Sequence, residues 1–175
     1  MKITLTKMEA ARNELREAIR LWFADGDLAS MHLLACSAHQ VIADINVARG
    51  GRDLIYDSLI IKEEGRAEWI KNLKNDYNHL KHADRSPDPN HPVVLDSEFT
   101  EFFILFTCLG LEIMKLPFTP AEKAFVIYFM VSHPNLVTEG RDPFSGVPKE
   151  SIAAARIVPK SVFFTAFIQR LEEQN

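Results

Sequence analysis

The densest set of reactive side chains lies in residues 74–85, with the sequence KNDYNHLKHADR. These twelve positions hold two histidines, two asparagines, two aspartates and three basic residues, and no other stretch concentrates so many groups that can move a proton or hold an anion. Histidine titrates near neutral pH and can act as a general acid or base. Lysine and arginine bind phosphate and carboxylate groups. We therefore expect a functional site to include this stretch.

Helical spacing divides the stretch into a polar and an apolar side. Asn78 lies three residues before Lys81 and four before His82, so these side chains share one side of a helix. Arg85 extends that side past the expected helix end near Asp84. The apolar side, which we expect to anchor the helix in the core, consists of Leu73, Tyr77 and Leu80. The candidate catalytic residues are Lys81, His82 and Arg85, and the candidate ligand-binding residues are Asn78, His79 and Asp84.

A second group of reactive residues, His32, Cys36 and His39, occupies one flank of an earlier apolar segment. The two histidines are seven residues apart with the cysteine between them on adjacent turns, and helical bundles can build metal sites from facing helices. His79 or His82 would complete such a site from another helix, with Asp76 as a carboxylate ligand. The compact zinc spacings C-x-x-C and H-E-x-x-H are absent. The alternative to a metal site is that His32, Cys36 and His39 are packed core residues. We expect no cofactor.

Composition restricts the class of protein. Hydrophobic residues make up 47% and charged residues 25% of 175 positions, the balance of a soluble globular chain. A net charge of −4 argues against a protein whose main task is to grip a nucleic-acid backbone. The two cysteines do not form a disulfide framework, which favours a reducing compartment. The N-terminal residues lack the apolar run of a signal peptide. The longest nearly uninterrupted apolar run, 102–111, is too short to span a bilayer. We expect a cytoplasmic protein that does not contact a membrane.

Helix start and stop signals predict the elements that position these residues. The pattern of a capping box occurs twice, at Thr6 to Glu9 and at Thr119 to Glu122. In the second one, Pro120 occupies the first helical position. Three prolines between 87 and 92 end the helix that carries the polar stretch. The expected helices begin at Thr6, at Asp27, at Asp53 (a short one to Ile61), after the breaker Gly65, at Ser97, at Pro120, near Lys149 and at Pro159.

The pattern as a whole predicts an all-α fold. We expect one domain over 1–175, a helical bundle of about five main helices plus one or two short ones. The segment from Phe99 to Met114 is apolar nearly all round, which is typical of a buried helix, and we expect it to be the central one. The residues of 135–146 are expected to form a loop.

Residues 78–85 resemble an N-x-x-K-H-A-D-R signature of an uncharacterised family of bacterial all-helical proteins. The first two helices, including Ala10-Ala11, Ala18 to Leu21 and the segment around His32, are similar to that family as well, so the resemblance covers most of the first hundred residues. It implies a bacterial helical protein and assigns no activity.

A wider resemblance is to HEPN-type helical bundles. Many of these are ribonucleases with an arginine and a histidine four to six residues apart at a helix start, and they often work as dimers. Arg85 and His91 have that order and separation, although Pro87 and Pro89 place this pair in a loop. The resemblance implies a metal-independent ribonuclease and a homodimer.

Three functions are compatible with these residues. The one we favour is a binding or regulatory module that recognises an anionic ligand or partner, a small molecule or RNA, through Asn78, Lys81, His82 and Arg85. The alternative is a HEPN-like ribonuclease or nucleotide-acting enzyme with His82 as acid and base and the two cations on phosphate. The third is a metal-binding bundle. A purely structural role is the competing interpretation of the stretch, because cations also complement the dipole at a helix C-terminus.

Overall fold

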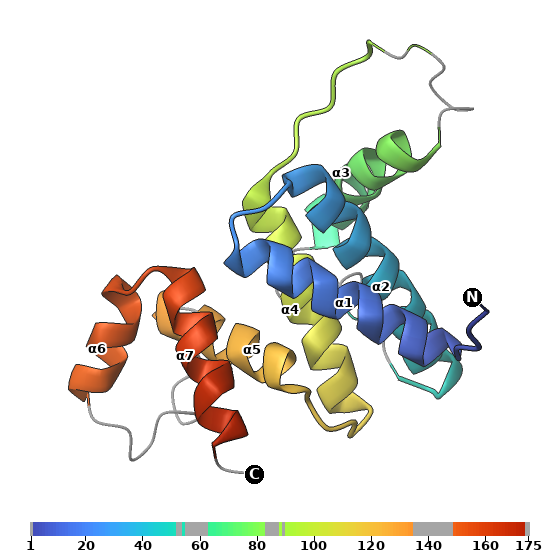
Figure 1. The fold of residues 1–175 in the computed structure, drawn as a ribbon. Helices are drawn as coiled ribbons and strands as arrows, with labels where there is room; N and C mark the ends of the chain where they lie inside the picture. The colour runs from blue at the N-terminus through green and yellow to red at the C-terminus, as the bar shows by residue number, and fades with distance from the viewer. Residues whose placement is uncertain are drawn as a thin grey trace. The chain divides into compact units, whose positions relative to one another are not determined.

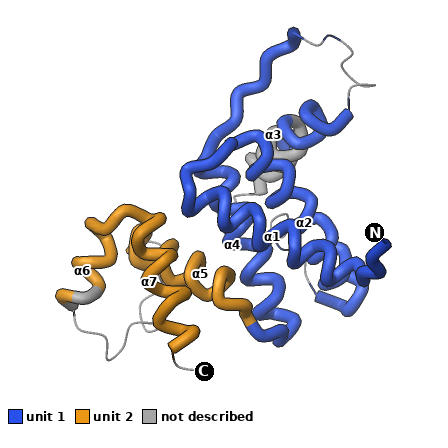
Figure 2. The backbone as a smooth tube through the Cα atoms, in the orientation of Figure 1, with its two compact units in different colours: residues 1–117 blue, residues 118–175 orange. Residues whose placement is uncertain are grey.

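The computed structural model describes residues 2–51, 54, 63–82, 88, 90–134 and 149–173 (Figure 1). These residues form seven α-helices and no strand, which confirms the predicted all-α class. The chain groups into two compact units, Met1–Pro117 and Phe118–Asn175, hereafter unit 1 and unit 2 (Figure 2). The prediction of one domain over 1–175 stays a prediction, and the two units are described separately.

Unit 1 is a four-helix assembly organised around its second helix. Its elements are α1 (Lys7–Phe23), α2 (Leu28–Ala48), α3 (Glu63–Lys81) and α4 (Ser97–Ile113). Helix α2 packs against α1, α3 and α4, so it is the central helix of unit 1. The sequence had predicted that the segment that forms α4 would be the central one. One face of α4 is buried, whereas Phe99 is 39% exposed and Ile113 is 60% exposed.

Local capping interactions set the first two helix starts as predicted. The Thr6 hydroxyl accepts a hydrogen bond from the Glu9 backbone N–H at 3.1 Å, and the Glu9 carboxylate accepts one from the Thr6 N–H at 2.7 Å. Asp27 caps α2 by accepting from the Ser30 N–H at 2.8 Å. These bonds satisfy backbone donors that have no partner inside the helix.

Two predicted boundaries were wrong, and one prediction is untested. Helix α3 begins at Glu63, so Gly65 lies inside its first turn and does not break it. The cap of α4 is Asp96, whose carboxylate accepts from the Glu98 N–H at 2.8 Å, and Ser97 is the first helical residue. The predicted short helix from Asp53 to Ile61 lies outside the described residues, apart from Leu54.

The core of unit 1 lies where α1, α2 and α4 meet. Small side chains allow the close approach, since Ala35 and Ala38 of α2 are fully buried. Gly110 of α4 serves the same purpose, because an added Cβ would lie only 3.0 Å from the Ile42 side chain. The fully buried large apolar side chains of these helices are Leu15, Ile19, Phe23, Ile42, Ile104 and Leu111.

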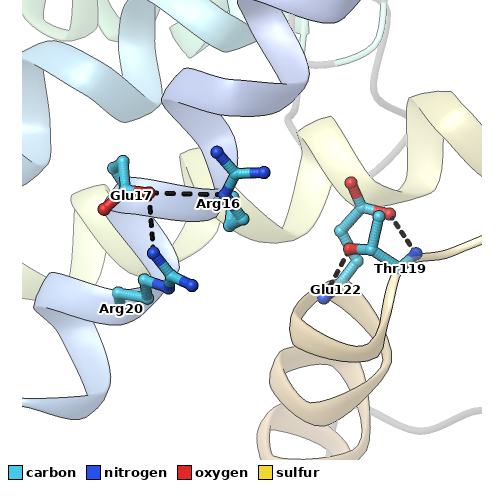
Figure 3. A network of polar contacts seen from close by, with 5 residues as sticks. All are labelled: Arg16, Glu17, Arg20, Thr119 and Glu122. Atoms are coloured by element: carbon cyan, nitrogen blue, oxygen red, sulfur yellow. Dashed lines mark hydrogen bonds and ion pairs between the residues drawn. The ribbon is translucent and has the colours of Figure 1, made fainter.

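Unit 2 consists of α5 (Pro120–Ser132), α6 (Lys149–Ile157) and α7 (Lys160–Glu172), with α5 in contact with both others. The predicted capping box at Thr119 and Glu122 is present, and Figure 3 shows its two hydrogen bonds. The predicted loop 135–146 lies outside the described residues. None of the helices in the described ranges is long and apolar enough to cross a membrane.

Candidate functional site

The last turn of α3 assembles three of the predicted polar residues. His82 directly follows the helix, and its backbone N–H donates to the Asn78 carbonyl at 2.9 Å, which continues the helical hydrogen bonding by one residue. Lys81 is exposed, whereas Asn78 and His82 are half-buried. Of the other predicted residues, Asp84 and Arg85 lie outside the described part of the chain.

The Lys81 ammonium is held by a neighbour on its own helix. Its Nζ donates to the Tyr77 hydroxyl at 2.8 Å and lies 5.0 Å from the centroid of the Tyr77 ring. This combines a hydrogen bond with a cation–π contact. Helical spacing predicted that Tyr77 lies on the apolar side that anchors the helix in the core. In the structure its side chain is half-buried and its hydroxyl accepts the hydrogen bond from Lys81. Tyr77 therefore positions Lys81.

The structure brings together two histidines that the sequence treats separately. The rings of His79 in α3 and His91 in the proline-rich stretch 87–92 have centroids 5.0 Å apart, at an interplanar angle of 43°. The His79 Nε2–H donates to the His91 carbonyl oxygen at 3.3 Å. A turn presents His91, because its backbone N–H donates to the Asp88 carbonyl and the Asn90 N–H donates to the Asp88 carboxylate. Sequence spacing carries no signal for this contact, which spans twelve residues and a loop.

A buried chain of hydrogen bonds connects α2 to the start of α4. The Thr100 hydroxyl lies 3.2 Å from the Asp96 carbonyl and 2.9 Å from His32 Nδ1, and the Cys36 sulfur lies 3.5 Å from His32 Nε2. Since a carbonyl can only accept, Thr100 donates to Asp96 and accepts from a protonated Nδ1. The neutral His32 ring then accepts from the Cys36 thiol at Nε2. Thr100, His32 and Cys36 therefore each have a hydrogen-bond partner.

Electrostatics agree with this proton arrangement. Burial lowers the pKa of the His32 imidazole, and the charge of Asp76 on α3 opposes that effect without cancelling it. Burial raises the pKa of the Cys36 thiol well above its usual range, and Asp76 acts in the same direction. A neutral imidazole and a protonated thiol follow. Because the thiolate is the nucleophile and the metal ligand, Cys36 is placed as a packed side chain.

His39, one turn further along α2, is only 1% exposed. Its ring lies 5.3 Å from that of Phe103 in an edge-to-face arrangement, and the same phenyl ring meets His32 at 5.7 Å. Burial lowers the pKa of His39 from 6.5 to about 4. Across the described residues, no three histidine, cysteine or acidic side chains are grouped as metal ligands. The packing gives His32, Cys36 and His39 a structural role in the core.

Comparison with protein-family models, with curated proteins and with solved structures finds no match to this chain. The two family resemblances stated from the sequence therefore stay predictions, and the function is argued from the residues alone.

Proposed function

We propose that this protein is a binding or regulatory module that recognises an anionic group of a ligand or partner through the last turn of α3. The observation that carries the proposal is the exposed Lys81 ammonium held in place by Tyr77. A cation whose position is already restrained loses less side-chain entropy when it binds an anion. Asn78 and His82 lie on the neighbouring flank and add hydrogen-bonding groups.

The charges at this end of the helix favour an anion. The carbonyl end of a helix behaves like about half a negative charge, which would repel an anionic ligand. The full positive charge of Lys81 exceeds that value, and the opposite charges of Asp84 and Arg85 follow it in the sequence. The cytoplasmic location, bacterial origin and homodimeric state expected from the sequence belong to the same proposal.

Replacing Lys81 by methionine is expected to weaken anion binding about tenfold or more, because a hydrogen bond to a charged group contributes about 1.5–3 kcal/mol. The measurement is an NMR titration with inorganic phosphate and, separately, with citrate, following the ring signals of His79 and His82. Lys123→Met removes an exposed lysine of α5 and is the matched control. Equal binding by wild type and Lys81→Met would contradict the proposal.

A metal-independent ribonuclease or nucleotide-acting enzyme is the second candidate, with His82, Lys81 and Arg85 in the catalytic roles. The approach of His79 and His91 favours it, since two imidazoles 5.0 Å apart supply a second acid–base group near the same helix end. Such an enzyme needs an acid, a base and a cation for the phosphate transition state.

On this second candidate, His82→Ala lowers the rate of RNA cleavage about 10²–10⁴-fold, the range typical of a lost acid–base group. The assay uses a fluorescent RNA oligonucleotide in the presence of a chelator. His133→Ala, which changes a histidine at the end of α5, is the control and is expected to cleave at the wild-type rate. The same rate in wild type and His82→Ala would exclude His82 from the reaction.

A further inference from the structure

We propose that His79 and His91 form a binding site for a borderline transition-metal ion, Zn²⁺, Ni²⁺ or Cu²⁺. The protein donors are the His79 Nε2 atom, the His91 carbonyl oxygen and the His91 imidazole, and water completes the coordination. This site is distinct from the three buried residues of α2 that the sequence suggested. It also does not depend on the anion-binding function, because it uses neither Lys81 nor Asn78.

The distances match those of two donors on one ion. With metal–donor bonds of about 2.0–2.1 Å in tetrahedral geometry, two donor atoms lie about 3.3–3.4 Å apart. The His79 Nε2 atom and the His91 carbonyl oxygen are separated by 3.3 Å. That separation is slightly long for an N–H···O hydrogen bond, whose usual range is about 2.7–3.2 Å. The separation of these two donor atoms therefore fits their binding to one ion.

The ring positions agree with the same interpretation. Two imidazoles bound to one tetrahedral ion have ring centroids about 5 Å apart, given the same bond lengths. The centroids of His79 and His91 are 5.0 Å apart. His91 is exposed and His79 is half-buried, so an ion has access from solvent on one side and support from the helix on the other.

The donor chemistry selects the class of ion. Imidazole nitrogens suit zinc, copper and nickel, whereas magnesium and calcium prefer sites built from several oxygens. An ion bound by both histidines would join α3 to His91 of the proline-rich stretch.

The test is a calorimetric titration of the full chain, without an affinity tag, with zinc chloride. We expect about one ion per chain, and about tenfold or greater loss of affinity in both His79→Gln and His91→Gln, because each removes an imidazole donor. Magnesium chloride is expected to give no binding. His82→Gln, three residues from His79 on the same helix end, and Lys81→Met are the matched controls and retain zinc binding.

A second readout separates metal binding from a change in folding. In NMR spectra the ring nitrogens of His79 and His91 are expected to shift together when zinc is added, while circular dichroism of the two glutamine variants equals that of wild type. Zinc affinity that is unchanged in both variants, or lost equally in His82→Gln, would overturn the assignment. If Lys81→Met loses anion binding and retains zinc binding, the two proposals stand separately.

Discussion

Acidification from pH 7 to pH 5 is expected to destabilise unit 1 by about 2 kcal/mol through the buried His39, and the loss reaches about 3 kcal/mol near pH 4. In the folded state burial lowers the pKa of this imidazole from 6.5 to about 4. Between these two values the unfolded chain takes up a proton that the folded chain does not. The stabilising contribution is therefore complete above about pH 6.5 and is lost as the pH falls toward 4. His32, whose pKa is also lowered, contributes with the same sign.

The measurement is urea unfolding at pH 7, 6 and 5, followed by tryptophan fluorescence. Both tryptophans, Trp22 and Trp69, belong to unit 1, so the signal reports on that unit. His39→Leu is expected to reduce the dependence of the unfolding free energy on pH by about 2 kcal/mol over this range. His133→Gln lies in unit 2 and is the control. A pH dependence that is the same in His39→Leu and wild type would show that another group is responsible.

Phe103→Ala is expected to lower the stability of unit 1 by about 3–5 kcal/mol, the range for removing a buried phenyl group. Phe103 is 4% exposed, and its ring packs against the rings of both His32 and His39. The substitution removes these contacts and leaves space beside both imidazoles. Water that enters this space reduces the cost of charging His39, so its pKa rises toward the ordinary value. The variant should therefore be less stable at pH 7 and also less sensitive to acid than wild type.

Phe102→Ala is the matched control, because Phe102 is the adjacent residue of α4, is only half-buried and pairs with Phe106 at 6.5 Å. We expect a smaller loss of stability and the wild-type dependence on pH. The measurement is the same urea unfolding at pH 7 and pH 5. Equal losses in the two variants, or an unchanged pH dependence in Phe103→Ala, would contradict the assigned packing.

Interactions between residues close in the chain were predictable. The capping boxes at Thr6 and Thr119 join residues three apart, so both partners are visible in the sequence and no other element is needed to form them. The gathering of Asn78, Lys81 and His82 on one turn follows from helical spacing in the same way. The wrong boundaries have local causes as well. Asp96 competes with Ser97 as a cap, and a single glycine such as Gly65 costs a helix only about 1 kcal/mol.

The partners that decide the chemistry come from elsewhere in the chain. Spacing indicates that His32 and Cys36 share a flank, but only packing against α4 brings Thr100, 68 residues later, to the imidazole and fixes its proton on Nδ1. The approach of His79 to His91 depends in the same way on the path of the chain after α3. Helical periodicity follows from the backbone and is already present in the sequence. The meeting of distant side chains depends on how helices pack and loops return, which the tertiary structure alone decides.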